Sequence, residues 1–148
     1  MSKTALFPGT FNPFTIGHYS LVKRALTIFD KVIIAIGINS TKENNLDEIE
    51  KNKKQIADLF KNENVKVITY TTLTADIVKA EKASCIVRGI RGISDYEYEK
   101  NMADINKELF EIETVFLFSD LKYAHISSSL IRELKRFGKE YKHLLPES

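Results

Sequence analysis

The segment from Pro8 to His18, PGTFNPFTIGH, combines residue types that hold phosphate. It follows a short apolar run and precedes a helical pattern, so His18 is expected on the first turn of a helix. Free N–H groups and the positive end of the dipole bind anions there, while Gly9 and Gly17 allow close approach of the main chain. His18 adds a donor whose charge depends on pH. The segment predicts a nucleotide or phosphate site; the alternative is that its glycines only form turns and His18 only begins a helix.

Two arginines form a second candidate group, in the tetrapeptide RGIR. Lysine outnumbers arginine by 17 to 5, so Arg88 and Arg91 stand out. Guanidinium groups donate in a planar, bidentate way to phosphate oxygens, and the end of an apolar strand would hold them firmly. The alternative is a structural ion pair with Asp95, Glu97 or Glu99.

Further candidates follow other predicted strands and helix starts. Ser127, Ser128 and Ser129 precede an apolar-faced helix, where they cap the helix and leave N–H groups that could receive phosphate. Lys42 lies in a polar loop, where its ammonium either folds over a phosphate or is simply solvated. Glu99 is the one plausible ligand residue of the acidic run, because Asp95 is explained by its place at a helix start.

Several classes of site are excluded by spacing. His18, His125 and His143 have no metal-ligand spacing, and the single cysteine, Cys85, sits in an apolar run typical of a buried thiol. We therefore expect no metal held by a cluster of protein ligands. The sequence contains neither GxxxxGK[ST] nor GxGxxG, and no Ser/His/Asp or Cys/His arrangement.

The elements that must position these residues alternate along the chain. Apolar, β-branched runs predict strands, and segments of helical period separate them. The strands are expected at residues 4–7, 32–38, 65–70, 85–87 and 114–118, and the helices at residues 18–29, 46–60, 73–82, 94–109 and 127–137. This alternation predicts an α/β fold: a Rossmann-like, doubly wound sheet of five parallel strands with helices on both faces. Each candidate segment then follows a strand, at the sheet edge where ligands bind in such folds.

Composition sets broader limits. At 148 residues with 43% hydrophobic residues, the chain is expected to form a single domain over residues 1–148. A net charge of +2 provides no general attraction to nucleic acid or to an anionic membrane. No apolar run approaches the ~20 residues that span a bilayer, and the start lacks a signal peptide, so a cytoplasmic location is expected.

The motifs GTFNPFTIGH, RGIRGISDYEYE and YAHISSS, with the Lys42 loop, resemble the phosphopantetheine adenylyltransferase family of the (H/T)xGH nucleotidyltransferase superfamily. The resemblance spans the whole chain, and RGIR, SDYEYE and ISSS are more specific than TIGH. It implies reversible transfer of an adenylyl group from ATP to 4'-phosphopantetheine, giving dephospho-coenzyme A and pyrophosphate. It also implies Mg²⁺ as cofactor, a place at the penultimate step of coenzyme A synthesis, and a homohexamer.

The resemblance assigns roles to matching positions. Thr10 would touch both substrates, and His18 would bind the ATP phosphates and stabilise the transition state, helped by Arg91. Lys42 and Arg88 would hold phosphopantetheine, with the main chain at Thr74 along its arm. The remaining ATP contacts would be Phe11, Gly89, Ile90, Arg91, Glu99, Tyr123, Ala124, His125, Ile126, Ser127, Ser128 and Ser129.

The chain departs from the family pattern at three places. Asn12 replaces the common Asp of GTFDP, KENNLDEIEK replaces KKPxFSxEER after Lys42, and His125 replaces an aromatic residue. Thr15 is typical of this family, whereas cytidylyltransferase and nicotinamide-mononucleotide adenylyltransferase relatives usually have His.

Two rival functions remain beside this hypothesis. One is a related nucleotidyltransferase with another phosphorylated acceptor, such as glycerol phosphate or nicotinamide mononucleotide, against which RGIR and ISSS argue. The other is a non-catalytic ATP-binding module with the same fold, against which the joint presence of Thr10, His18 and Arg91 argues.

Overall fold

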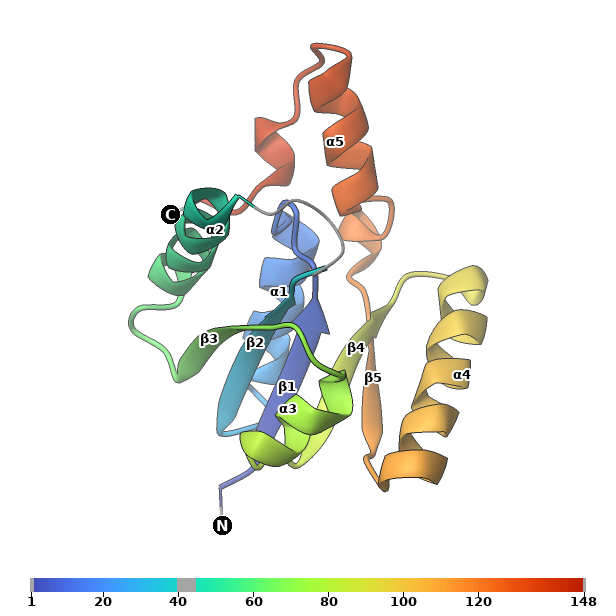
Figure 1. The fold of residues 1–148 in the computed structure, drawn as a ribbon. Coiled ribbons are helices and arrows are strands. Elements are labelled where there is room, and N and C mark those ends of the chain that lie inside the picture. Colours follow the sequence, from blue (N-terminus) through green and yellow to red (C-terminus); the bar gives the residue numbers. More distant parts are fainter. Residues whose placement is uncertain (1, 40–44, 148) are drawn as a thin grey trace.

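The computed structural model of the protein describes residues 2–39 and 45–147. Strands and helices alternate along these residues (Figure 1). The strands are β1 (Thr4–Gly9), β2 (Lys31–Gly37), β3 (Val65–Tyr70), β4 (Cys85–Ile90) and β5 (Thr114–Phe118). The helices are α1 (Ile16–Ala25), α2 (Leu46–Leu59), α3 (Thr74–Ala80), α4 (Ile93–Phe110) and α5 (Ser128–Arg136), with short 3-10 turns at Leu121–Tyr123 and Lys142–Leu144.

The five strands form one sheet in the order β3-β2-β1-β4-β5, and every pair is parallel. Helices α1 and α2 pack on one face through Val22, Ala25 and Ile56, while α3 packs on the other through Ala75 and Val78. The predicted doubly wound sheet is therefore confirmed. Because chain order reverses between β1 and β4, the loops after these strands diverge there, which is where such sheets bind ligands.

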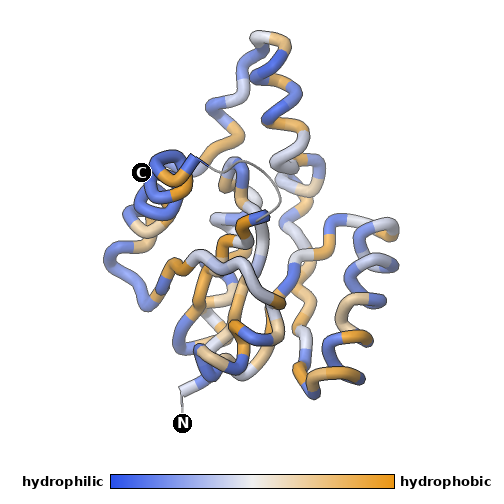
Figure 2. Tube along the Cα trace, in the orientation of Figure 1, coloured by the Kyte–Doolittle hydropathy of each residue, from blue (hydrophilic) through white to orange (hydrophobic). Residues whose placement is uncertain are grey.

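Burial explains why the central strands are the most apolar. Ala5, Leu6 and Phe7 of β1 are buried, as are all five residues from Val32 to Ile36 in β2. The hydropathy trace is accordingly orange along these strands (Figure 2). Cys85 is buried in the same core, as its apolar surroundings predict. Strands covered on both faces need apolar residues on both sides, which alternation alone would not supply.

The fourth strand is longer than the sequence predicts. The predicted end at residue 87 is wrong, because β4 continues through Arg88, Gly89 and Ile90, paired with β5 up to Phe118. In β1 the pairing with β4 stops at Leu6, although pairing with β2 continues to Gly9. The sheet thus opens between the carboxyl ends of β1 and β4. Arg88 therefore lies on β4 at this opening, and not directly after the strand as predicted.

The carboxyl-terminal part forms a small apolar cluster of its own. Ile126, Ile131 and Leu144 are buried together, and Tyr123 packs against them. This cluster sets α5 beyond the carboxyl edge of the sheet (Figure 1). Among the described residues, no helix is long and apolar enough to cross a membrane.

Candidate functional site

Two cavities lie at the opening between β1 and β4. Their volumes are about 360 Å³ and 320 Å³, and both are lined by Pro8, Gly9, Thr10, Arg88 and Glu99. These shared residues are therefore the boundary where a group in one cavity would meet a group in the other. We call the two spaces the apolar cavity and the polar cavity after their remaining lining residues.

The apolar cavity lies between α3, α4 and the sheet. Its apolar lining residues are Leu73, Ala75, Ile86, Met102, Ala103, Ile105 and Phe110. Thr74 also lines it, and its hydroxyl lies 2.9 Å from the Tyr70 hydroxyl. Such walls suit a slender, largely apolar chain with a few polar groups.

The polar cavity lies between the first turns of α1 and α5. It is lined by Gly17 and His18 on one side, and by Ser127, Ser128 and Ser129 on the other. Ser127 caps α5 by accepting a hydrogen bond from the N–H of Leu130 at 3.0 Å. Two helix N-termini facing one space provide oriented N–H groups and two positive dipole ends. The cavity is therefore suited to an anion of several phosphates.

His18 is held in one tautomer by the cap of α1. The Thr15 N–H donates to His18 Nδ1 at 2.9 Å, and Thr15 Oγ1 accepts from the His18 N–H at 3.2 Å. Nδ1 is an acceptor in this arrangement, so the neutral ring carries its proton on Nε2. Burial, then the positive charges of Arg88 and Arg91, lowers the pKa of His18 from 6.5 to about 4. At neutral pH His18 is thus an uncharged donor. The sequence predicted a donor whose charge depends on pH, but His18 stays neutral across the physiological range.

Phe11 shapes the loop that leads to His18. Its ring is only 3% exposed and packs edge-on against Phe7, Phe14 and His18, with ring centroids 5.0 to 5.3 Å apart. A Cβ on Gly9 would lie 2.8 Å from this ring, so only glycine fits there. The Phe11 backbone is left-handed, at φ 49°. The exposed hydroxyl of Thr10, one residue earlier, makes no hydrogen bond to the described residues.

Arg88 is fixed by three hydrogen bonds at the boundary of the cavities. Its Nε and NH2 groups donate to the two Glu99 carboxylate oxygens at 2.8 and 2.7 Å, and NH1 donates to the Pro8 carbonyl at 2.5 Å. Glu99 is only 8% exposed. Burial lowers the pKa of Arg88, but the Glu99 carboxylate outweighs it and the net pKa is raised, so Arg88 remains a cation. The guanidinium bridges the gap where β1 has left β4.

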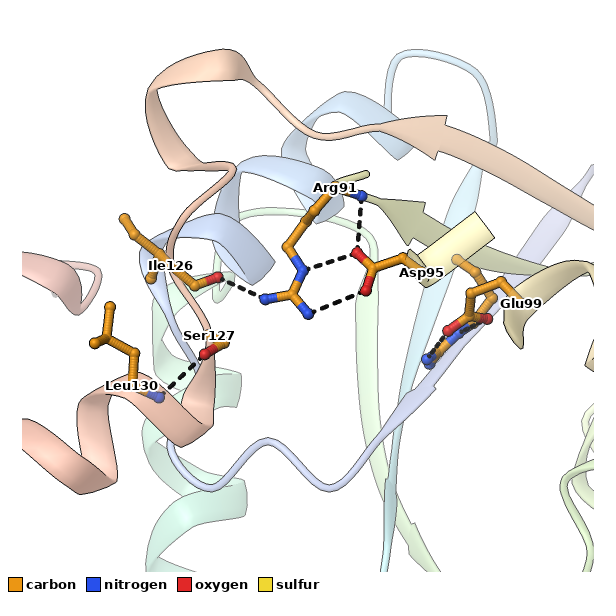
Figure 3. A network of polar contacts seen from close by, with 7 residues as sticks. Arg91, Asp95, Glu99, Ile126, Ser127 and Leu130 are labelled. Atoms are coloured by element: carbon orange, nitrogen blue, oxygen red, sulfur yellow. Dashed lines mark hydrogen bonds and ion pairs between the residues drawn. The ribbon is translucent and has the colours of Figure 1, made fainter. Parts of the chain in front are cut away.

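Arg91 is held in a different way (Figure 3). Its backbone N–H and its Nε both donate to Asp95 Oδ2 at 3.0 Å, and NH1 donates to the Ile126 carbonyl at 3.2 Å. Both arginines thus make the ion pairs that were the structural alternative for RGIR. Both also line the polar cavity, so the ion pairs orient the two cations toward it.

The remaining predicted residues are placed unequally. Gly89, Tyr123 and Ile126 line the polar cavity, and Gly89 lies so close to α1 that a Cβ would meet Leu21 at 2.5 Å. Ile90 is buried and lines neither cavity. Neither Ala124 nor His125 lines a cavity, and the His125 side chain is exposed. Lys42 lies outside the described residues.

Sequence reasoning missed two polar side chains that hold the loop after β1. Arg132 donates to the Asn12 carbonyl at 2.6 Å, and Asn52 donates to the Phe11 carbonyl at 3.1 Å. The scarcity of arginine could have singled out Arg132, which follows the serine run by one turn. No signal marks Asn52, an asparagine within a polar helix.

Comparison with known proteins agrees with this geometry. Residues 6–134 match the cytidylyltransferase-like family. A phosphopantetheine adenylyltransferase of Phocaeicola vulgatus is 51% identical over 98% of this chain and 96% of its own length. Two solved structures share the fold. A bifunctional NMN adenylyltransferase/ADP ribose pyrophosphatase of Francisella tularensis, complexed with AMP and a manganese ion, has a TM-score of 0.68 at 20% identity, over 98% of this chain and 44% of that one. A structure from Vibrio parahaemolyticus has a TM-score of 0.67 at 22% identity, over 99% of this chain and 95% of that one.

Proposed function

The chain belongs to the cytidylyltransferase-like family and, within it, to the phosphopantetheine adenylyltransferases, and from this membership we propose how its residues act. The enzyme transfers an adenylyl group from ATP to 4'-phosphopantetheine, giving dephospho-coenzyme A and pyrophosphate, the penultimate step of coenzyme A synthesis. The observation that carries the assignment of substrates to places is the pair of unlike cavities that share Thr10 and Arg88.

ATP occupies the polar cavity in this proposal. Its phosphates face Arg91 and the first turns of α1 and α5. His18 lies on the first of these turns, and Ser127 to Ser129 lie on the second. The pantetheine arm lies in the apolar cavity along Thr74 and Met102. The acceptor phosphate then sits at the shared boundary beside Arg88. In this placement the acceptor phosphate and the α-phosphate meet at the boundary that the two cavities share.

Catalysis consists of positioning and charge stabilisation. An oxygen of the acceptor phosphate, already anionic, attacks the α-phosphorus in line, and the bond to the departing pyrophosphate breaks. No proton has to be removed from the attacking oxygen, so no general base is needed. The Nε2 proton of His18 donates to a phosphate oxygen on which charge develops, and the Thr10 hydroxyl orients the attacking oxygen.

The two arginines act from opposite sides of the reacting phosphorus. Arg88 keeps N–H groups without partners among the described residues, and these bind the acceptor phosphate. Arg91, anchored by Asp95, stabilises the charge on the transferring and leaving phosphates. Lys42 adds a further charge on the acceptor side. The Glu99 carboxylate forms an ion pair with Arg88. In this proposal, Glu99 and Arg88 therefore contact ATP together.

The site fits a magnesium ion that enters bound to the nucleotide. The two carboxylates that line the polar cavity, Asp95 and Glu99, both already accept hydrogen bonds from arginines. Mg²⁺ prefers oxygen ligands and retains several waters, so it would be held mostly by the ATP phosphates and water. When bound, it supplies positive charge that offsets the charge of the phosphates.

Assembly and location complete the proposal. We propose that the protein works in the cytoplasm, as a single domain that assembles into a homohexamer. Apolar side chains that remain exposed on α4 and β5 support the assembly. Ile93 on α4, Phe118 on the edge strand β5, and Leu109 are all exposed. Burying such residues against other subunits would stabilise the assembly.

The direct test offers the enzyme ATP, Mg²⁺ and one acceptor at a time, and follows pyrophosphate release. We expect release with 4'-phosphopantetheine and none with glycerol phosphate or nicotinamide mononucleotide. Activity with either of those instead would identify a related nucleotidyltransferase. Tight ATP binding without release for any acceptor would identify a non-catalytic binding module.

A further inference from the structure

The loop after β1 is held by its carbonyl groups. Three successive carbonyls each accept a hydrogen bond from a side chain that is distant in sequence. The pairs are Phe11 with Asn52, Asn12 with Arg132, and Pro13 with Ser128. The last two donors come from α5, whose first turn lines the polar cavity. The first donor alone comes from α2, so the loop is held from two directions.

The Asn52 contact falls on the one residue of this loop that has a left-handed backbone. Asn52 Nδ2 lies 3.1 Å from the Phe11 carbonyl oxygen, in a partly buried position. Phe11 is left-handed at φ 49°, which a bulky residue adopts only when its surroundings enforce it. The buried ring fixes one side of Phe11, and the Asn52 amide fixes the peptide group that follows. Without this donor, that peptide loses its one side-chain partner from α2.

The position of this peptide bears on the reacting groups. Thr10 precedes Phe11 directly, and the ring of Phe11 lies edge-on to the His18 imidazole with centroids 5.0 Å apart. A rotation at Phe11 therefore moves the Thr10 hydroxyl and the imidazole relative to each other. We propose that Asn52 is a positioning residue for adenylyl transfer, which holds the Phe11 carbonyl from α2 so that Thr10 and His18 stay aligned on the same phosphate. This inference rests on the proposed function.

Three substitutions at Asn52 change its hydrogen bond to the Phe11 carbonyl to different degrees. Asn52→Ala removes the donor, whereas Asn52→Asp places carboxylate oxygens against a carbonyl oxygen and repels it. Asn52→Gln keeps an amide donor that can reach the carbonyl. Asn101, exposed on α4 and lining neither cavity, provides the matched control Asn101→Ala.

The variants are compared by kcat at saturating ATP, Mg²⁺ and 4'-phosphopantetheine, by thermal unfolding, and by hydrogen exchange of the amides of residues 10–15. We expect Asn52→Ala to lower kcat about fivefold to tenfold, the equivalent of one hydrogen bond, with faster exchange in this loop. Asn52→Asp should lower kcat further than Asn52→Ala does. Asn52→Gln should retain most of the wild-type kcat, and Asn101→Ala should have the kcat of the wild type.

Two results would overturn the inference. One is a kcat for Asn52→Ala within a factor of about two of the wild type. The other is a lowered melting temperature with unchanged loop exchange, which would make Asn52 a purely structural residue. Hydrogen exchange needs no substrate, so it reports on the loop even if the wild type proves inactive with 4'-phosphopantetheine. That inactivity would count against the proposed function and not against the hold on the loop.

Discussion

The polar and apolar cavities share lining residues but differ in the side chains that form the rest of their walls. In the polar cavity, groups such as His18 and Arg91 are oriented by hydrogen bonds to the backbone and to other side chains before any ligand arrives. In the apolar cavity, side chains such as Met102 and Phe110 provide shape and offer almost no polar partners. In the proposed mechanism, charge is stabilised in the polar cavity and the acceptor's arm is recognised in the apolar cavity. Thr10, Arg88 and Glu99 are the polar residues that line both cavities.

The largest effect should come from the polar cavity. His18→Ala removes the oriented Nε2 donor, and we expect kcat to fall by about 10² to 10³, as for the loss of one donor to a developing oxyanion. The measurement is pyrophosphate release at saturating substrates, with circular dichroism to verify folding. His125→Ala, an exposed histidine outside both cavities, is the control and should retain full activity. Near wild-type turnover in His18→Ala would remove electrostatic stabilisation by this residue from the mechanism.

An intermediate effect should come from the apolar cavity, and on a different constant. Ala103→Leu adds a branched side chain to the wall of that cavity. We expect KM for 4'-phosphopantetheine to rise about tenfold, near the lower end of overpacking costs, while KM for ATP stays within a factor of about two. Steady-state kinetics with each substrate varied in turn measures the split.

The matched control for this prediction is Ala57→Leu, at an exposed position on α2 that lines neither cavity. It should leave both constants unchanged. A rise in KM for ATP equal to that for the acceptor would show that the two cavities do not divide the substrates as proposed.

The smallest effect should be seen in stability against pH. The pKa of His18 is about 4 in the folded protein and near 6.5 when unfolded, so between these values the unfolded chain binds a proton that the native protein does not. The stabilisation is complete above pH 6.5 and is lost as pH falls toward 4. Urea unfolding between pH 7 and 5 should show a decline in the free energy of unfolding that is shallower in His18→Gln. The difference should stay well below the limit of about 1.4 kcal/mol per pH unit for one proton, because the imidazole is partly exposed to solvent. Equal slopes in the two proteins would contradict a lowered pKa.

The local pattern of apolar residues was sufficient to predict most strands and helices of the fold. Apolar, β-branched residues predicted a strand at residues 32–38, and β2 is buried along nearly its whole length. The last helix, predicted at residues 127–137, is α5 at Ser128–Arg136, and Gly138 follows it with a left-handed φ of 68°. These features depend on neighbours along the chain, which a sequence displays directly. The end of β4 was missed because Arg88 and Gly89 are held in the strand by pairing with β5, a partner distant in sequence.

The candidate site divides along the same line. Residue order was enough to predict that a glycine-containing loop, a helix start with His18, and two arginines follow strands of a parallel sheet and therefore meet at one edge. The neutral state of His18, the hold of Glu99 and Asp95 on the arginines, and the contact of Asn52 with the Phe11 carbonyl became visible only in the folded chain. The reason is physical. Residue type and order set which groups exist and on which element, whereas protonation state and orientation depend on burial and on partners that only folding brings within hydrogen-bonding distance.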